Sequence, residues 1–270
     1  MGLRSRVLRP LDVRRALRAK LVRAVDESVA RHSRAQTEEI VARLSAEVRT
    51  GADRVLAELR AVEIRDRRDT FAAAEREAVA STARFVQREL TGARHFGHPH
   101  DTLEHALSLA PSGGMALEFG VWTGTTLKII AARRDGGVHG FDSFAGLPED
   151  WRTGFASGTF GIEAPPEVPG AELVVGLFDD TLPGFLAAHP GPVDFLHIDS
   201  DLYSSAVTVL EQVGPRLRPG SVVVFDEFFN FPGWPAHEAR AWAEYVAARG
   251  LGFRYEAYTL DNEQVVIRLT

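Results

Sequence analysis

The stretch Met115-Ala-Leu-Glu-Phe-Gly-Val-Trp-Thr-Gly-Thr-Thr126 decides the fold of this chain. Its apolar run predicts a buried strand, its glycines at 120 and 124 predict a tight turn, and residues 125–134 have a helical pattern. A glycine turn lets a ligand come close to the backbone, and the start of a helix offers free N–H groups and a positive dipole end. The stretch therefore predicts a nucleotide-like ligand.

The spacing of the glycines favours one ligand class. The dinucleotide pattern G-x-G-x-x-G fails here, because Trp122 and Thr125 stand at its second and third glycine positions. S-adenosylmethionine (SAM) has no pyrophosphate to bind, and Glu118-x-Gly120-x-x-x-Gly124 is similar to motif I of class I SAM-dependent methyltransferases. A strand, turn and helix without any ligand would produce the same pattern, so this motif alone leaves both interpretations open.

Strand and helix patterns alternate along the rest of the chain. Further strands are expected over residues 137–141, 173–175, 193–198, 221–225, 254–258 and 264–269, and helices over 181–189, 204–217 and 235–249. This alternation predicts an α/β fold with a doubly wound, mostly parallel seven-stranded sheet covered on both faces, and the last two strands predict a hairpin with an antiparallel strand at the edge. Ligands bind such sheets beyond the carboxyl ends of the strands.

The chain has an N-terminal part of different composition. Residues 1–100 carry 21 Lys+Arg and 14 Asp+Glu, a balance of +7, whereas residues 101–270 have a balance of −13. We therefore expect two domains, a helical region over 1–100 and a catalytic domain over 101–270. The basic residues within 1–23 could lie on an anionic membrane or nucleic acid, but no aromatic residue lies among them, and a solvated helical extension is the favoured interpretation.

A seven-residue repeat runs through this helical region. Val41, Val48, Val55 and Val62 share one helical face, and Leu44 and Leu59 lie close to it, which suits a coiled-coil seam and a homo-oligomer. Gly51 and Glu58 are poor seam residues, so a helical pair or lid packed on the catalytic domain remains the alternative.

Composition excludes several other classes of site. The 270 residues contain no cysteine, which rules out disulfides, thiolate metal sites and cysteine nucleophiles. No apolar run approaches the roughly 20 residues that span a bilayer, and no secretory signal is evident. These observations predict a cytoplasmic protein without a stable membrane anchor.

Acidic residues follow the predicted strands. Asp142 ends the strand after the glycine turn, where a carboxylate can accept hydrogen bonds from both ribose hydroxyls, and Ser143 and Phe144 would flank the adenine. A turn-forming aspartate is the alternative. His197 is more typical of a packed core histidine than of a catalyst. The aromatic residues of the following loops would either wall a substrate pocket or belong to the core: Trp151, Phe228, Phe229, Phe231 and Trp234.

Four more acids end two neighbouring strands. Asp199 and Asp201 follow one strand, and Asp226 and Glu227 follow the next. Clustered carboxylates repel one another unless a cation or proton lies between them, and oxygen ligands favour a hard cation such as Mg²⁺. Such an ion could hold two vicinal hydroxyls of a substrate while a free carboxylate removes a proton. Helix and loop capping by Asp201 and Asp226 is the alternative.

Four segments together resemble the macrocin O-methyltransferase family, which consists of class I SAM-dependent enzymes with a Rossmann-like fold. The segments are Leu117–Thr126, Phe141–Glu149, Leu196–Ser205 and Arg218–Glu227. The resemblance implies that Asp199, Asp226 and Glu227 hold the metal and that Asp201 is the general base. It also places the cofactor contacts at Glu118, Gly120, Val121, Gly124, Thr125, Asp142, Ser143, Phe144, Gly176 and Asp199. This chain has Asp-Ser-Asp where Asp-Gly-Asp is expected, and Asp-Glu-Phe where Asp-Asp-Tyr is common.

The sequence therefore predicts a SAM-dependent O-methyltransferase, assisted by Mg²⁺, that methylates a hydroxyl of a small molecule such as a glycosylated natural product. A metal-independent methyltransferase and a non-catalytic scaffold that oligomerises through its N-terminal helices are the alternatives. A nucleic-acid methyltransferase is disfavoured because the acidic catalytic half would repel a polyanion.

Overall fold

The computed structural model describes residues 10–270, with side chains from residue 14 onward. The chain divides after Asp69 into two compact units. The helix α2 (Thr70–Glu89) and the strand β1 (Arg94–Phe96), which lie within the range 1–100 expected to be a separate helical region, belong to the same unit as the sheet. Among the described helices, none is long and apolar enough to cross a membrane.

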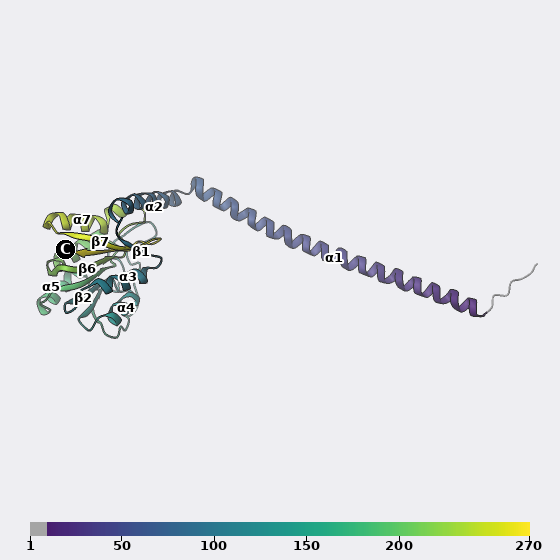
Figure 1. Cartoon of the computed structure of the whole chain (residues 1–270), viewed down its shortest axis with the longest axis horizontal. Coiled ribbons are helices and arrows are strands. Elements are labelled where there is room, and N and C mark those ends of the chain that lie inside the picture. The colour runs from purple at the N-terminus through teal and green to yellow at the C-terminus, as the bar shows by residue number, and fades with distance from the viewer. Residues whose placement is uncertain (1–9) are drawn as a thin grey trace, which may run out of the picture. The chain divides into compact units, whose positions relative to one another are not determined.

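The described part of the first unit consists of one continuous helix and the residue that follows it. The helix α1 (Pro10–Arg68) runs without a break (Figure 1). It has 59 residues, and every side chain described in it is exposed. It continues through Gly51, because no proline follows Pro10 and the sequence is rich in alanine, arginine and glutamate. The basic stretch 1–23 is helical from Pro10, and its first nine residues lie outside the described part of the chain.

The second unit is built on an eight-stranded sheet in the order β1-β7-β8-β6-β5-β2-β3-β4. The strands beyond β1 are β2 (Met115–Phe119), β3 (Val138–Asp142), β4 (Glu172–Val175), β5 (Val193–Ile198), β6 (Leu217–Phe225), β7 (Phe253–Thr259) and β8 (Val265–Leu269). Only β8 pairs antiparallel, with β6 and β7. The predicted α/β, doubly wound and mostly parallel class is confirmed.

Two details of the predicted sheet were wrong. The sheet has eight strands instead of seven, because residues 94–96, within the range expected to be helical, form β1, which pairs in parallel with β7. The antiparallel strand is not at the edge, because β8 hydrogen-bonds to β6 and thereby places β7 farther out, where β1 covers it. A single sequence shows a hairpin but does not show which of its strands faces the rest of the sheet.

Helices cover both faces of the sheet (Figure 1). On one face, α5 (Phe178–Ala188), α6 (Tyr203–Val213), α7 (Glu238–Arg249) and residues of α2 pack on strand residues such as Leu117 and Phe225. On the other face, α3 (Pro99–Leu109) and α4 (Thr125–Arg133) pack on alternate residues such as Ala116 and Val224. Burial on both faces explains why the central strands are almost continuously apolar.

The chain reverses its direction across the sheet between β2 and β5. From β2 it proceeds through β3 to β4 at one edge, and it then returns to β5 on the other side of β2. The register aligns the last residues of these strands, since Phe119 pairs with Phe141 and Ile198, and Ile198 pairs with Phe225. The residues after β2, β3, β5 and β6 therefore meet at one edge, at the switch point where such sheets bind ligands.

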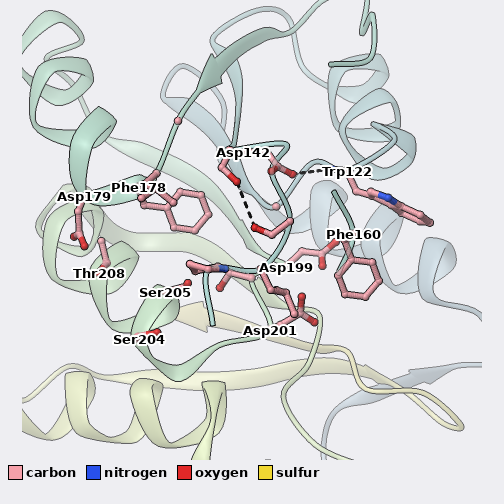
Figure 2. A pocket seen from close by; sticks show the side chains of 18 of the residues that line it. Trp122, Asp142, Phe160, Phe178, Asp179, Asp199, Asp201, Ser204, Ser205 and Thr208 are labelled. Atoms are coloured by element: carbon pink, nitrogen blue, oxygen red, sulfur yellow. Dashed lines mark hydrogen bonds between the residues drawn. The ribbon is translucent and has the colours of Figure 1, made fainter. Parts of the chain in front are cut away.

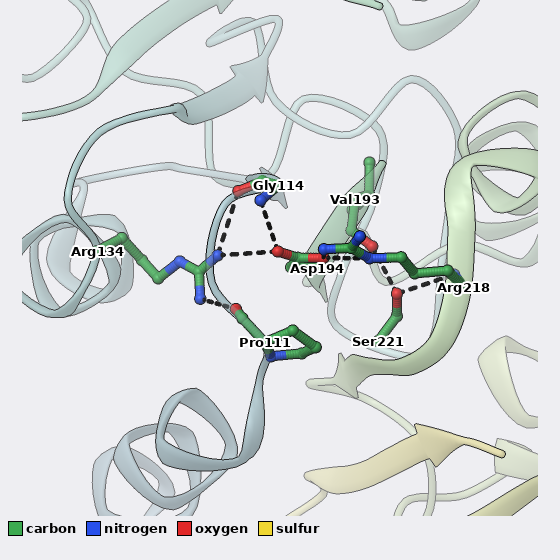
Figure 3. A network of polar contacts seen from close by, with 7 residues as sticks. All are labelled: Pro111, Gly114, Arg134, Val193, Asp194, Arg218 and Ser221. Atoms are coloured by element: carbon green, nitrogen blue, oxygen red, sulfur yellow. Dashed lines mark hydrogen bonds and ion pairs between the residues drawn. The ribbon is translucent and has the colours of Figure 1, made fainter. Parts of the chain in front are cut away.

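An ionic network ties the starts of the strands together at the opposite edge (Figure 3). The buried Asp194 accepts hydrogen bonds from Arg218 at 2.6 and 2.9 Å and from the backbone N–H of Gly114 at 2.6 Å. Arg134 lies 3.7 Å from the same carboxylate and donates to the carbonyl oxygens of Pro111 and Gly114. A buried carboxylate with this many partners fixes the relative positions of β2, β5 and β6.

Candidate active site

The turn after β2 brings two loops into contact. Gly120 has φ +95° and Gly124 has φ +74°, a region of backbone space that favours glycine. A Cβ atom on Gly120 would lie 1.7 Å from the carbonyl oxygen of Asp199, so only glycine fits against the loop that follows β5. Gly124 then stands before the first residue of α4, as the sequence predicted.

Asp142 holds this turn in place. One of its oxygens accepts hydrogen bonds from the backbone N–H groups of Val121 and Trp122, each at 2.8 Å, and the other accepts one from Phe144 at 2.7 Å. Asp142 ends β3, as the sequence predicted, and it also lines a cavity (Figure 2). Its carboxylate therefore orders the glycine turn in addition to facing the space where a ligand would lie.

The cavity joins the glycine turn to the clustered acids. It has a volume of about 440 Å³ and opens between the loops that follow β2, β3, β4, β5 and β6. Among the predicted cofactor contacts, five line it: Gly120, Asp142, Ser143, Gly176 and Asp199. The acids Asp201, Asp226 and Glu227 line it as well, and Figure 2 shows Asp199 and Asp201 across the cavity from Asp142.

The other predicted cofactor contacts do not line this cavity. Glu118, Val121 and Phe144 are buried, and Phe144 packs in the core beside Val168. Gly124 and Thr125 also stand away from the cavity wall, and a Cβ on Gly124 would meet Val168 at 2.8 Å. The motif thus predicted the loop correctly but did not indicate which of its residues face inward.

Burial and mutual repulsion govern the four acids. Burial raises the pKa of Asp199 and of Glu227 well above the usual carboxyl range, and neighbouring carboxylates raise both further. Burial also raises the pKa of Asp201 to about 7, although the charge of Arg152 acts in the opposite direction. Burial pushes the pKa of Asp226 upward too, but hydrogen bonds from His197 and Gln264 outweigh that effect and keep it below its usual value.

His197 lies beneath this acidic cluster. Its Nδ1 donates to Oε1 of Glu118 at 2.8 Å, and its Nε2 lies 3.5 Å from Oδ1 of Asp226. Burial lowers the pKa of His197, but its two carboxylate partners outweigh burial and raise that pKa well above its usual value. His197, Asp199 and Asp226 also offer ligand atoms that all lie within 4.8 Å of one another, a spacing that could hold a metal ion.

Comparisons with known proteins agree with this architecture. Residues 117–228 match a protein family described as "Methyltransferase domain". These residues form a methyltransferase domain. The match starts in β2 and ends just after the acids Asp226 and Glu227, so it covers the glycine turn, Asp142 and both acid pairs. The resemblance stated from the sequence motifs is confirmed.

Individual proteins of known function or structure are similar to parts of this chain. The 8-demethyl-8-(2,3-dimethoxy-alpha-L-rhamnosyl)-tetracenomycin-C 4'-O-methyltransferase of Streptomyces olivaceus is 43% identical over 53 residues, which are 20% of this chain and 19% of that protein. The match therefore spans about a fifth of the relative's length. Among solved structures, the calicheamicin methyltransferase CalS11 is 27% identical to this chain, with a TM-score of 0.49; the match covers 63% of this chain and 76% of CalS11. The O-methyltransferase NovP is 23% identical, also with a TM-score of 0.49; the match covers 63% of this chain and 79% of NovP.

Two charged residues near the acids of the methyltransferase domain were not predicted. Glu238, the first residue of α7, is fully buried and accepts a hydrogen bond from the backbone N–H of Glu227 at 3.2 Å. Burial raises the pKa of Glu238 well above its usual value. Arg152 lies 3.9 Å from the ring centre of Trp151 and pairs with Glu263 at 3.1 Å. Arg152 lies in a loop and Glu238 at the start of a helix, both outside the motifs quoted from the sequence, so no motif predicted a role for them.

The aromatic residues expected to form either a pocket wall or a core belong to the core. Those in the loops after β3 and β6 are at most 9% exposed: Trp151, Phe228, Phe229, Phe231 and Trp234. Phe228, Phe229 and Trp234 pack on Phe85 of α2. The aromatic side chains that line the cavity of the methyltransferase domain are instead Trp122, Phe160 and Phe178.

Proposed function

We propose that this chain is a SAM-dependent O-methyltransferase that methylates a hydroxyl of a small molecule such as a glycosylated natural product. The observation that carries the proposal is the single cavity that joins the glycine turn and Asp142 to four clustered acids. Residues suited to bind a cofactor and residues suited to remove a proton from a substrate therefore line the same cavity. The name of the Streptomyces relative, which acts on a rhamnosyl tetracenomycin, supports a sugar hydroxyl as the acceptor.

The loops after β2, β3 and β4 suit the cofactor. Asp142 and Ser143 would accept and donate hydrogen bonds to the ribose, and the bare backbone of Gly120 and Gly176 would let the ligand approach. Glu118, Val121, Gly124, Thr125 and Phe144 would then act indirectly by shaping the turn, since they do not line the cavity. Bound SAM supplies an electrophilic methyl group, and the protein has only to hold it in line with the acceptor oxygen.

Three of the acids suit a divalent cation. Asp199, Asp226 and Glu227 offer only oxygen atoms, and Oε2 of Glu227 is buried without a hydrogen-bond partner. A cation there would offset the repulsion that raises the pKa of Asp199 and of Glu227, and oxygen ligands favour Mg²⁺. Bound Mg²⁺ would make a coordinated substrate hydroxyl more acidic. Asp199 lines the cavity between the glycine turn and the other acids, which suits its assignment both to the cofactor contacts and to the metal ligands.

Asp201 suits the role of general base. It lines the cavity beside the proposed metal ligands, and its backbone is fixed in a left-handed conformation with φ +62°. A base works best when its pKa lies near the working pH, and burial raises the pKa of Asp201 to about 7. A carboxylate oxygen of Asp201 would accept the proton of the acceptor hydroxyl as that oxygen attacks the methyl group.

Calorimetric titration with S-adenosylhomocysteine, the demethylated product of SAM, tests the cofactor assignment. We expect micromolar binding that weakens at least about tenfold in Asp142→Ala and stays unchanged in Asp135→Ala, an exposed aspartate outside the cavity. Absence of binding to the unmodified protein would favour the non-catalytic scaffold. Methyl transfer that continues in EDTA would favour the metal-independent alternative.

The assembly of the chain through α1 belongs to the same proposal. The valines at 41, 48, 55 and 62, with Leu44 and Leu59, form an apolar stripe whose side chains are 54–70% exposed. The valines repeat every seven residues, the period of a coiled-coil seam, which suits pairing with the same helix of a second copy. A stripe of this kind in water favours association, and light scattering of the full chain measures it.

A further inference from the structure

One pair of large aromatic side chains is exposed at the cavity. Trp122 is 50% exposed, whereas the other tryptophans of the chain, at 151, 234 and 242, are at most 9% exposed. Phe160 is 37% exposed, and its ring centre lies 5.8 Å from that of Trp122 at an interplanar angle of 69°. Both side chains line the cavity, and Figure 2 shows them together on one side of it.

The backbone holds both rings in place. Trp122 has φ +44° and Phe160 has φ +68°, a conformation that bulky residues rarely adopt. The N–H of Trp122 donates to Asp142, and the neighbours of Phe160 are held by hydrogen bonds from Gly161 to Gly158 at 3.2 Å and from Ile162 to Phe144 at 3.0 Å. Strained residues that the surrounding contacts fix in this way cluster at ligand sites.

The position of the pair favours the acceptor over the cofactor. In Figure 2 Phe160 lies toward Asp199 and Asp201, Trp122 lies beside Asp142 on the same side as Phe160, and Phe178 and Asp179 lie on the opposite side of the cavity. In an edge-to-face contact one ring presents its edge to a face of the other, and the partial exposure of both side chains leaves aromatic surface that a ligand can contact. The ring centre of Phe155 lies 5.7 Å from that of Phe160, so Phe160 also packs on a second aromatic ring.

We propose that Trp122 and Phe160 form a platform for the apolar C–H face of a pyranose ring in the acceptor. A sugar ring packed in this way directs its hydroxyls outward along its edge, and one of them can then reach Asp201. This inference rests on the proposed function, because it presumes an acceptor hydroxyl near the acids. It assigns the binding of the sugar ring to two aromatic residues for which the sequence motifs predicted no role.

Calorimetric titration with p-nitrophenyl α-L-rhamnopyranoside tests the platform. The full-length protein is first saturated with S-adenosylhomocysteine and Mg²⁺. We expect Trp122→Leu and Phe160→Leu to weaken binding of this probe at least about tenfold, because leucine keeps apolar bulk but removes the aromatic face. Trp122→Phe should restore binding to within about threefold of the unmodified protein, and Leu260→Ala, an exposed apolar residue outside the cavity, should have no effect.

The same titrations separate this platform from its alternatives. Affinity for S-adenosylhomocysteine should change by less than about twofold in every variant, which also shows that each variant is folded. Weakening of S-adenosylhomocysteine binding to the same extent as that of the probe would assign the pair to the cofactor and overturn the proposal. Equal binding of p-nitrophenol, which lacks the sugar, would also overturn it, as would absence of probe binding to unmodified protein that binds S-adenosylhomocysteine. Failure of S-adenosylhomocysteine itself to bind would remove the proposed function, and the platform with it.

Discussion

His197 and Glu118 are directly paired across neighbouring parallel strands, and their side chains meet at 2.8 Å in the buried centre of the sheet. The other ring nitrogen of His197 lies 3.5 Å from Asp226. A hydrogen-bonded chain thus connects the strand that precedes the glycine turn with an acid that faces the cavity. The positive imidazole also lowers the repulsion among the acids above it.

Replacing His197 with Gln should destabilise the protein by about 3–5 kcal/mol, because Glu118 and Asp226 would lose their buried cationic partner. Glu118→Gln in the same background should recover part of this loss, with a coupling of about 1–3 kcal/mol between the two sites. Urea unfolding of the two single variants and the double variant measures the coupling. Strictly additive effects would show that the two side chains do not act as a pair.

Replacing Gly120 with Ala should abolish binding of S-adenosylhomocysteine, because the new Cβ would lie 1.7 Å from the carbonyl oxygen of Asp199. Gly154→Ala is a matched control: Gly154 has φ +92°, close to the φ of Gly120, but a Cβ there would meet no atom within 4 Å. Both variants carry the strain of a positive φ, of order 1–3 kcal/mol, and only the first carries the clash. Calorimetry and thermal unfolding that fail to separate the two variants would contradict this account.

The sheet could be predicted from the sequence because its strands are short apolar runs separated by helical patterns. The position of β8 could not, since hairpin pairing depends on which strand meets β6. In the site, Asp142, Asp199, Asp201, Asp226 and Glu227 line the cavity as their places at the strand ends predicted.

The orientation of side chains within loops was harder to predict. Phe144 lies two residues after Asp142, but its backbone turns to φ +55° and its ring enters the core, so closeness in sequence did not place it beside a ligand. Trp122 lies in the same loop as two glycines and projects into the cavity instead. Glu238 reaches the acids only through the packing of α7, a contact between residues far apart in the chain.

The rate of methyl transfer should rise with pH and level off above about pH 7, because burial raises the pKa of Asp201 to about 7 and the base must be ionised. Asp201→Asn should lower kcat by about 10²–10⁴-fold and leave binding of S-adenosylhomocysteine intact. A pH series of single-turnover rates measures both effects. An unchanged pH profile in Asp201→Asn would assign the proton transfer to another group.

Without metal, the stability of the protein should fall as pH rises above the unfolded carboxyl pKa of about 4. Burial raises the pKa of Asp199, Glu227 and Glu238 in the folded protein. The stability that these three acids contribute is therefore complete below the unfolded carboxyl pKa of about 4, and it is lost as pH rises through their raised folded-state pKa values. The pKa of Asp226 is lowered, so its contribution to stability increases with pH instead. That contribution changes only at more acidic pH.

Mg²⁺ should therefore raise the unfolding midpoint more at about pH 8 than at about pH 5, because a bound cation stabilises the ionised acids that repel one another. Thermal unfolding in EDTA and in Mg²⁺ at both pH values provides the comparison. Asp226→Asn serves as the control, since it removes one of the proposed ligands and should abolish the effect of the ion. An equal midpoint shift at both pH values, or one that persists in Asp226→Asn, would place the ion elsewhere.

Association through α1 should be lost when a charge enters its apolar stripe. Val55 is 59% exposed on this stripe, and Val55→Glu should convert the assembly to monomers in light scattering. Thr50→Glu adds the same charge on another face of the helix and should leave the mass unchanged. Gly51→Ala should strengthen the assembly, because a Cβ at Gly51 meets no atom within 4 Å and alanine favours the helix by about 1 kcal/mol. A monomeric unmodified chain, or equal effects of the two glutamates, would show that the stripe has no such partner.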